Sequence, residues 1–184
     1  LASATRLKTL IKKELQAAAK QFGDDRRSRI VLRQEAKAIS KVELAPVEPM
    51  TVILSRNGWV RSAKGHDIDP QGLPHKAGDG LLSAARGKSN QQAVFIDSTG
   101  RTYAAANHSL PSARGHGEPL TGRFSPPPGG GFKAVLTGEP TRLILMASDA
   151  GYGFLTELQN LFTKNQKGKA MLRLPIGAEP LHPL

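Results

Sequence analysis

The side chains in this sequence that could do chemistry are mainly positively charged. The 184 residues include 26 Lys and Arg against 15 Asp and Glu, a net charge of +11 at pH 7. A surplus of this size favours a polyanionic partner, with nucleic acid ahead of an anionic membrane surface. Three stretches combine cations with glycine: Lys76–Gly80, Arg114–Gly117 and Lys167–Lys169. A cation there can neutralise a phosphate, while glycine lets the backbone approach it closely.

These stretches supply the core of a candidate DNA-binding surface. We expect their cations on one outer rim of the fold, flanked by further cations, where they contact duplex phosphates without reading bases. The candidates are Arg61, Lys64, Lys76, Arg114, Arg123, Lys167 and Lys169. Each one alone could equally be a solvated surface charge. A competing hypothesis assigns the affinity to cations near the N-terminus: Lys8, Lys12, Lys13, Arg26 and Arg27.

Nothing in the sequence predicts catalysis or a bound metal. The chain has no cysteine, which excludes disulfides and cysteine-ligated zinc. Its five histidines lack the spacing of metal ligands, and His66 beside Asp67 has no nucleophile placed with it. Tyr103 and Tyr152 lie in apolar runs, where we expect them to pack against other side chains. No P-loop motif for nucleotide phosphates is present.

The N-terminal segment is predicted to be a helix. Between residues 5 and 22 the apolar residues recur at steps of three or four, with lysines on the opposite face. Gly23 stands where a left-handed residue would end the helix. The spacing suits a coiled coil, although barely two heptads are visible, and a helix packed on its own domain is equally compatible.

A charged junction separates this helix from the rest of the chain. It contains one strand candidate, Ile30–Leu32, and closes at Pro46 and Pro49, which break any helix. The predicted domains are therefore residues 1–22, the end of a coiled-coil helix; residues 23–49, a connector; and residues 50–184, a β domain. Because the chain begins with Leu1 rather than methionine, we expect a piece of a longer protein.

The β domain is predicted to consist of repeats. Three apolar runs each end in Ser or Asp, followed three residues later by Gly58, Gly100 or Gly151. Ser or Asp at the first position and Gly at the fourth suit a type I turn that closes a hairpin. The runs are continuous rather than alternating, which indicates strands covered on both faces.

Further strand candidates lie between these turns, at Leu81–Ala85, Phe132–Leu136 and Met171–Leu174. A period of forty to fifty residues with about four strands per unit is typical of propeller-like blades. We count about three repeats, the third incomplete at its end. Ser125–Gly131 has the composition of a linker, but the repeat resumes directly after it, so we interpret it as an enlarged surface loop.

Together these motifs resemble the A subunits of bacterial type IIA DNA topoisomerases. The helix with the motif Gly23-Asp24-Asp25-Arg26-Arg27 is similar to the junction after their long coiled coil, and the repeats are similar to their C-terminal β-pinwheel domain. The most specific motifs are Ser62–Asp67, Phe95–Arg101 and Leu110–Gly122. They resemble the topoisomerase IV branch in particular, over essentially the whole chain.

The resemblance implies a mainly β fold, a partial β-pinwheel of four-stranded antiparallel blades preceded by a helix. It also implies binding of double-stranded DNA for ATP-dependent strand passage, which relaxes supercoils and decatenates chromosomes. The parent enzyme would be an A2B2 assembly with the B subunit of topoisomerase IV, the ATPase, in the cytoplasm and associated with the nucleoid. Mg²⁺ and ATP would serve that holoenzyme. No cofactor and no catalytic residue is expected in this piece, whose parent keeps its DNA-cleaving tyrosine in an N-terminal region.

Two alternatives stay open at this point. Gyrase A subunits carry the box Gln-Arg-Arg-Gly-Gly-Lys-Gly in the first blade and use it to wrap DNA. The corresponding stretch here, Leu73–Gly80, has one Lys where that box has three positive charges, and it adds Asp79. This departure favours topoisomerase IV over a gyrase with a degenerate box. A protein-binding propeller scaffold, in which the positive charge is incidental, is the other alternative.

Overall fold

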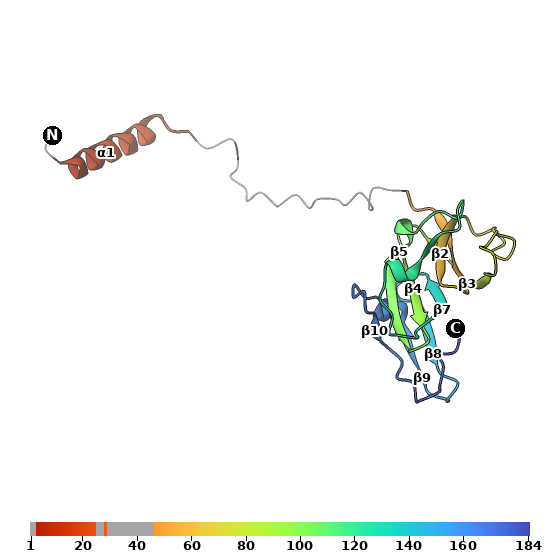
Figure 1. Ribbon diagram of the computed structural model, residues 1–184. Helices are drawn as coiled ribbons and strands as arrows, with labels where there is room; N and C mark the ends of the chain where they lie inside the picture. The colour runs from red at the N-terminus through yellow and green to blue at the C-terminus, as the bar shows by residue number, and fades with distance from the viewer. Residues whose placement is uncertain (1–2, 25–27, 29–45) are drawn as a thin grey trace. The chain divides into compact units, whose positions relative to one another are not determined.

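A computed structural model describes residues 3–24, 28 and 46–184 of the chain (Figure 1). The chain divides into two units, residues 1–38 and residues 39–184. The predicted strand Ile30–Leu32, together with Arg26 and Arg27, lies outside the described residues. The domain boundaries at residues 22 and 49 therefore stay predictions.

The described part of the first unit is helix α1, Ala4–Phe22, as the apolar spacing predicts. The helix ends where the Gly23 N–H donates to the Ala19 carbonyl at 3.0 Å. Gly23 is not left-handed as expected, because its φ is −72°. Glycine still suits the position, since a Cβ there would lie 2.2 Å from the Ala19 carbonyl oxygen. Among the helices described, none is long and apolar enough to cross a membrane.

The second unit is built of antiparallel β-sheets, which confirms the predicted mainly β class. Two sheets have four strands, in the orders β3-β1-β2-β6 and β10-β5-β4-β7, and a third consists of β8 and β9. The strands are β1 Pro49–Ser55, β2 Trp59–Lys64, β3 Leu81–Lys88, β4 Gln92–Asp97, β5 Arg101–Ala106, β6 Glu118–Pro119, β7 Phe132–Thr137, β8 Leu143–Ala147, β9 Gly153–Glu157 and β10 Lys169–Ala170. Short 3-10 turns lie at Asn107–Ser109, Leu120–Gly122 and Leu158–Leu161.

The three marker glycines occupy equivalent hairpin turns, as predicted. Their φ angles are +75° at Gly58, +76° at Gly100 and +81° at Gly151. Each glycine N–H donates to the carbonyl of the residue three positions earlier, at 3.0 to 3.1 Å. These turns join β1 to β2, β4 to β5, and β8 to β9, so the repeat unit is a hairpin followed by a longer connection.

The Ser or Asp that opens each turn has a specific structural role. Its side chain accepts a hydrogen bond from the backbone N–H four residues later, at 3.0 to 3.3 Å in all three turns. The acceptors are Ser55, Asp97 and Ser148. This bond fixes the residue that directly follows the turn glycine, which explains why the repeats share a short polar residue at the first turn position.

Successive blades exchange strands. We call β1–β3 blade 1, β4, β5 and β7 blade 2, and β8–β9 with the C-terminal residues blade 3. The connection that follows β5 adds β6 to blade 1, and the connection that follows β9 adds β10 to blade 2. The registers correspond, because the residue after the turn glycine pairs with the second residue of the added strand: Trp59 with Pro119, and Arg101 with Ala170. We call β6 and β10 the hook strands.

The predicted strand at Met171–Leu174 is wrong. The hook strand ends at Ala170, and the N–H groups of Met171 and Leu172 then donate to the carbonyl of Gly100 at 3.1 and 3.0 Å. These donors cap the β4–β5 turn instead of extending a ladder. Blade 3 has two named strands among the described residues, with hydrogen bonds between Leu145 and Leu184 along β8.

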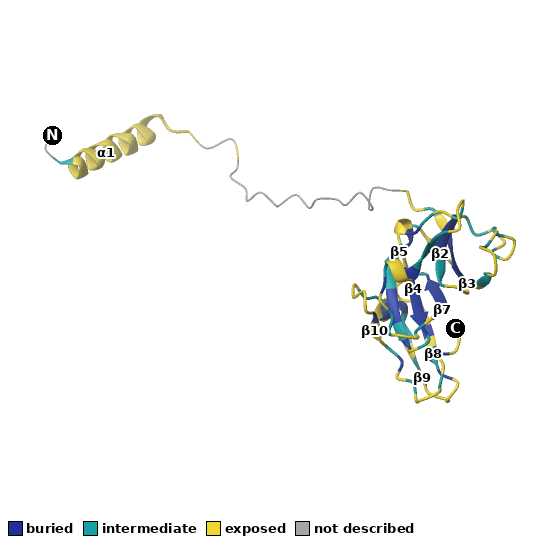
Figure 2. Cartoon of the chain, in the orientation of Figure 1, coloured by how far each residue is buried: buried dark blue, intermediate teal, exposed yellow. Residues whose placement is uncertain are grey.

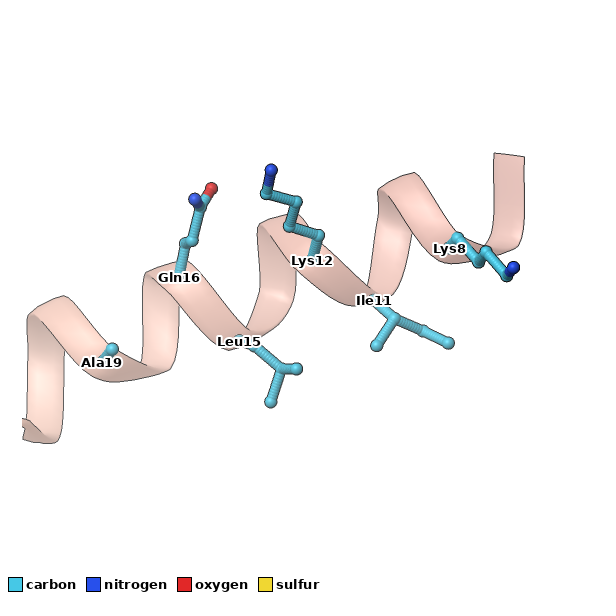
Figure 3. Close-up of a pocket in the computed structure, with 6 residues that line it drawn as sticks. All are labelled: Lys8, Ile11, Lys12, Leu15, Gln16 and Ala19. Carbon is cyan, nitrogen blue, oxygen red and sulfur yellow. The ribbon is translucent and has the colours of Figure 1, made fainter. Parts of the chain in front are cut away.

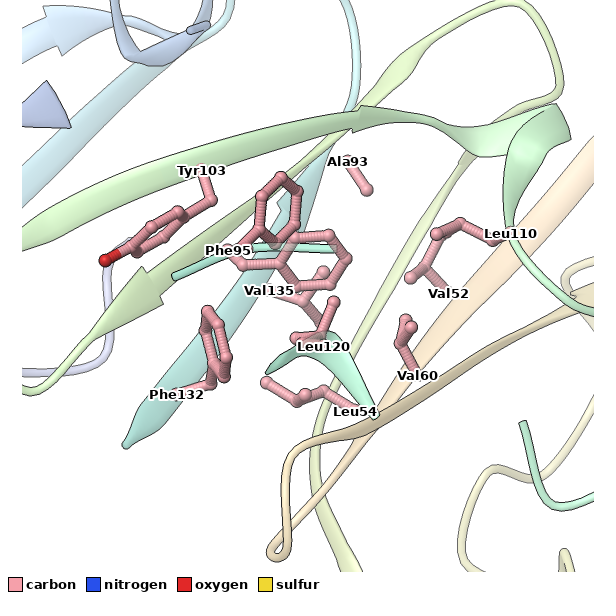
Figure 4. Close-up of a cluster of buried hydrophobic side chains, with 11 residues drawn as sticks. Val52, Leu54, Val60, Ala93, Phe95, Tyr103, Leu110, Leu120, Phe132 and Val135 are labelled. Atoms are coloured by element: carbon pink, nitrogen blue, oxygen red, sulfur yellow. The ribbon is translucent and has the colours of Figure 1, made fainter. Parts of the chain in front are cut away.

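The core consists of two layers of buried side chains between the blades. The strands that carry these side chains are largely buried (Figure 2). The first layer, between blades 1 and 2, contains Phe95, Phe124, Phe132 and Tyr103, whose rings lie 5.2 to 6.4 Å apart (Figure 4). The second, between blades 2 and 3, includes Val94 and Ile96 from the other face of β4. The central blade is therefore buried on both faces, as its continuous apolar runs predict.

Candidate nucleic-acid interface

Two of the three basic, glycine-containing stretches hold equivalent places in the fold. Arg114–Gly117 leads directly into hook strand β6, and Lys167–Gly168 leads into β10. Both hook strands form the sheet edge opposite β3 and β7. Gly117 has a φ of +87° and Gly168 a φ of +70°. A Cβ would lie 2.2 Å from the Val60 carbonyl oxygen in the first case and 2.6 Å from the Tyr103 ring in the second.

These glycines therefore have a packing role that the sequence reasoning missed. They let each basic loop lie directly against the outer strand of the preceding blade, at φ angles that side chains rarely adopt. The cations next to them remain exposed. Arg114, Lys167 and Lys169 have no carboxylate partner among the described residues, and the Lys169 ammonium donates to the Asn160 carbonyl at 2.9 Å.

The third stretch, which carries Lys76, is not at an equivalent point of the repeat. It runs directly into β3 rather than into a hook strand. The Lys76 ammonium lies 3.4 Å from the centre of the Trp59 ring, a cation–π contact with the first residue of β2. Lys76 is exposed, so its charge can still face a ligand.

Asp79 fastens this loop to the β1–β2 turn. Its carboxylate accepts from the backbone N–H groups of Asn57, at 3.1 Å, and Gly80, at 2.8 Å. Partial burial would raise the pKa of Asp79. Hydrogen bonds from Ser55, Gly80 and Asn57 and the nearby His75 outweigh that effect and lower the pKa below its usual value. The acidic residue that departs from the gyrase box thus anchors the loop.

Arg61 is not a surface cation, contrary to its predicted place flanking the rim. It is 2% exposed, and its guanidinium donates to the carbonyls of Pro74 at 2.8 Å and Gly115 at 3.2 Å. His75 Nε2 lies 3.5 Å from the same group. Burial lowers the pKa of Arg61, and the field of Asp79 opposes that shift. The arginine therefore bonds the backbone of both basic loops rather than lying exposed beside them.

The other two flanking cations have acidic partners. Arg123 is half-buried, forms an ion pair with Glu118 and donates to the Ser109 carbonyl at 2.5 Å. Lys64 lies 2.8 Å from Glu48, but its side chain is 80% exposed. An exposed pair of this kind is weak, so Lys64 can exchange its partner for a phosphate at little cost.

Arg101 was not among the candidate site residues drawn from the sequence, yet it also contacts a basic loop. Its guanidinium Nη1 donates to the carbonyls of Lys167 at 3.2 Å and Gly168 at 3.5 Å. Arg101 thus contacts the basic loop of blade 3 much as Arg61 contacts that of blade 2. No sequence signal separates it from a surface arginine.

Three of the five competing cations lie on helix α1, and the other two, Arg26 and Arg27, are outside the described residues. Lys8, Lys12 and Lys13 are exposed. Figure 3 shows Lys12 on one side of the helix and Ile11 and Leu15 on the other, an amphipathic surface rather than an enclosed cavity. These lysines meet the electrostatic requirement for phosphate contacts, and a binding experiment must separate them from the loop cations.

The tyrosines differ in environment. Tyr103 is fully buried, as expected, and its hydroxyl donates to the Asp97 carboxylate at 2.7 Å. Burial, together with this carboxylate, raises the pKa of Tyr103 above its usual value. Tyr152 is 63% exposed, so its predicted packing is wrong: no described strand covers the outer edge of β9. Among the described residues, no group of three His, Asp or Glu side chains could hold a metal ion.

Curated proteins from several bacteria are similar to this chain and carry the same description. The A subunit of DNA topoisomerase 4 from Pseudomonas aeruginosa is 57% identical over 183 residues, and that from Escherichia coli K12 is 53% identical over 184. Each alignment covers 100% of this chain and 24% of the relative, so the chain spans about a quarter of their length. No protein-family model matches the chain.

Solved structures agree with this result. The structure of the E. coli ParC C-terminal domain has a TM-score of 0.71 and 53% identity, covering 74% of this chain and 56% of that one. A C-terminal domain of DNA topoisomerase IV and the DNA gyrase A C-terminal domain have TM-scores of 0.58 and 0.54, at 15% and 11% identity. At these identities the last two comparisons show a common fold alone.

Strand-exchanged blades and these matches define the class: the C-terminal β-pinwheel domain found in the A subunits of bacterial type IIA DNA topoisomerases. The matches over the whole length of the chain then separate the branches of that class. The chain belongs to the family of DNA topoisomerase IV A subunits. The preference for topoisomerase IV over gyrase, drawn from the sequence, is confirmed.

Proposed function

We propose that this domain binds duplex DNA through phosphate contacts made by its outer basic loops. One observation carries the proposal: the sheets of consecutive blades present equivalent loops at their corresponding edges, each with exposed cations that have no carboxylate partner among the described residues. The contacts would come from Arg114, Lys167 and Lys169, with Lys76 and Lys64 beside them. The proposal leaves out Arg61, which is buried, and Arg123, which is half-buried and paired with Glu118.

Phosphate contacts of this kind need no base recognition. Equivalent loops on successive blades place cations at repeated intervals along one edge, which suits the repeated charges of a duplex backbone. The single Lys76 in place of the three cations of the gyrase box supports weak segment binding over tight wrapping.

For the whole protein, we propose the role that its relatives' name implies. The domain would select and present duplex segments to a topoisomerase IV holoenzyme, an A2B2 assembly with its ATPase B subunits. That assembly would pass one duplex through another, relaxing supercoils and decatenating chromosomes in the cytoplasm at the nucleoid. Mg²⁺ and ATP would be the cofactors of the assembled enzyme.

The test is a titration of a short duplex, followed by fluorescence anisotropy, across a range of salt concentrations. The loop variant carries Lys76→Ala, Arg114→Ala, Lys167→Ala and Lys169→Ala. The matched control removes four cations from the opposite edge and its surroundings: Arg86→Ala, Lys88→Ala, Lys133→Ala and Arg142→Ala. We expect the loop variant to lose most of its affinity and about one unit of salt slope per residue that contacts a phosphate.

The alternatives give different results. Equal losses in the loop and control variants would mean that net charge alone drives binding. If removal of Lys8, Lys12 and Lys13 lowers the duplex affinity while the loop variant binds as tightly as the wild type, the affinity belongs to helix α1. Wild-type binding that is absent would refute DNA binding and favour a protein-binding scaffold, and binding that is insensitive to salt would refute the phosphate contacts.

A further inference from the structure

Two arginines donate hydrogen bonds to backbone carbonyls of the basic loops. Arg61 lies in β2 and Arg101 in β5, the strands that receive the hook strands of the following blade. They occupy different positions in their strands, yet both donate to carbonyls of the loop that leads into the hook strand. Arg61 donates to Gly115, and Arg101 donates to Lys167 and Gly168.

Arg61 also joins two loops to each other. The same nitrogen, Nη1, donates to the Pro74 carbonyl at 2.8 Å and to the Gly115 carbonyl at 3.2 Å. Pro74 is two residues from Lys76, and Gly115 directly follows Arg114. One buried guanidinium therefore fixes the separation between two candidate phosphate-binding cations that are far apart in the sequence.

The chemistry of arginine suits this task. Its guanidinium stays charged in proteins and has five N–H donors in a rigid plane, so it can bond several carbonyls at once. Hydrogen bonds from a charged donor are stronger than those between neutral groups. Lysine in the same place would keep the charge but lose the fixed geometry.

We propose that Arg61 and Arg101 are positioning residues for DNA binding: each holds a basic loop so that its exposed cations meet the phosphates without prior ordering. The inference rests on the proposed function. Its physical basis is that a preorganised surface loses less conformational entropy on binding. Freeing a loop should lower DNA affinity by roughly tenfold, which corresponds to the ordering of one or two side chains and their backbone.

A double-mutant cycle tests this coupling. Arg61→Met is made in the wild-type chain, in a Lys76→Ala/Arg114→Ala background and in a Lys167→Ala/Lys169→Ala background. We expect it to weaken duplex binding in the wild type and in the second background, and to have little effect in the first. Arg101→Met should show the reverse pattern, because it holds the other loop. Each arginine is thus the control for the other.

Two further measurements separate positioning from stability alone. Amide hydrogen exchange in residues 114–117 should rise with Arg61→Met, and exchange around residues 167–168 should rise with Arg101→Met. Arg61→Lys should restore part of the affinity, because it can still bond one carbonyl. If Arg61→Met does not fold, Arg61→Lys and the Arg101 arm carry the same test.

The outcomes distinguish the inference from the function beneath it. If the wild type binds DNA with a steep salt dependence but the cycle is additive in every background, the positioning role is refuted and the proposed function stands. The positioning role is also refuted if thermal stability falls while the affinity of the folded protein is unchanged. If the wild type shows no salt-dependent binding, both fail.

Discussion

Replacing Gly117 with alanine should release hook strand β6 from blade 1. At its φ of +87° a residue with a Cβ costs about 1–2 kcal/mol. The new Cβ would lie 2.2 Å from the Val60 carbonyl oxygen, a backbone atom that cannot rotate away. Relief of such overpacking costs a further 1–3 kcal/mol or so. We expect a total destabilisation of about 3 kcal/mol, a large part of the ~5–15 kcal/mol that domains of this size possess.

Thermal unfolding followed by circular dichroism measures this effect. For a chain of this length, about 3 kcal/mol corresponds to a Tm lower by about 10 °C. Gly115→Ala is the matched control, because it lies in the same loop, its φ is not positive, and a Cβ there would meet nothing within 4 Å. Its Tm should stay within about 2 °C of the wild type.

A Gly117→Ala variant that melts with the control would refute the reasoning. It would show that the loop moves away from Val60 without loss, so the hook strand would not be what completes blade 1. Gly168→Ala, which brings a Cβ to 2.6 Å from the Tyr103 ring at a φ of +70°, repeats the experiment on blade 2.

Three other predictions follow from the described geometry. Trp59 is the single tryptophan of the chain and lies under the Lys76 ammonium, so saturating duplex DNA should change its fluorescence, and Lys76→Ala should abolish most of that change. The raised pKa of Tyr103 favours its protonated form in the folded state, so the stability present below pH ~10 should decline as the pH rises further. Tyr103→Phe should remove that dependence in alkaline unfolding titrations. The same change should destabilise the fold by about 1–3 kcal/mol, because Asp97 loses a buried hydrogen-bond donor. Supercoiled plasmid incubated with the purified 184-residue chain, Mg²⁺ and ATP should keep its topology on an agarose gel, and reproducible relaxation would contradict the assignment of its chemistry.

The sequence predicted the hairpins because their signals are local. Ser or Asp, two variable residues and a glycine at Gly58, Gly100 and Gly151 specify a turn whose bonds all lie within five residues. The continuous apolar run through Val94 and Ile96 likewise predicted a strand buried on both faces. Such features are determined by a short stretch of chain and need no knowledge of its partners.

The hook strands could not be predicted in the same way. Glu118–Pro119 and Lys169–Ala170 are two residues long, show no periodicity, and pair only because the preceding blade offers an open edge. The strand predicted nearby, Met171–Leu174, was inferred from its apolar residues. The backbone N–H groups of Met171 and Leu172 instead cap the β4–β5 turn. A partner distant in sequence determined both outcomes.

The candidate site was predicted in part for a similar reason. Exposure of Arg114, Lys167 and Lys169 agrees with their polar, glycine-containing surroundings. The prediction that Arg61 lies on the surface was wrong because its burial depends on two distant loops, which contribute the carbonyls of Pro74 and Gly115. One signal could have raised doubt: it follows Trp59 and Val60 in a strand whose next residues are small, where an arginine is surrounded by buried neighbours.

Strand exchange between blades has a consequence for synthesis on the ribosome. Residues 49–88 contain three strands of blade 1. The fourth strand, β6, cannot pair with the open edge of β2 until residues 118–119 have left the ribosome. Blade 2 waits in the same way for residues 169–170. Nascent chains that stall between these points expose an unpaired strand edge, the feature that promotes aggregation. A shortened version of the domain that ends before residue 119 should therefore leave the β2 edge of blade 1 unpaired.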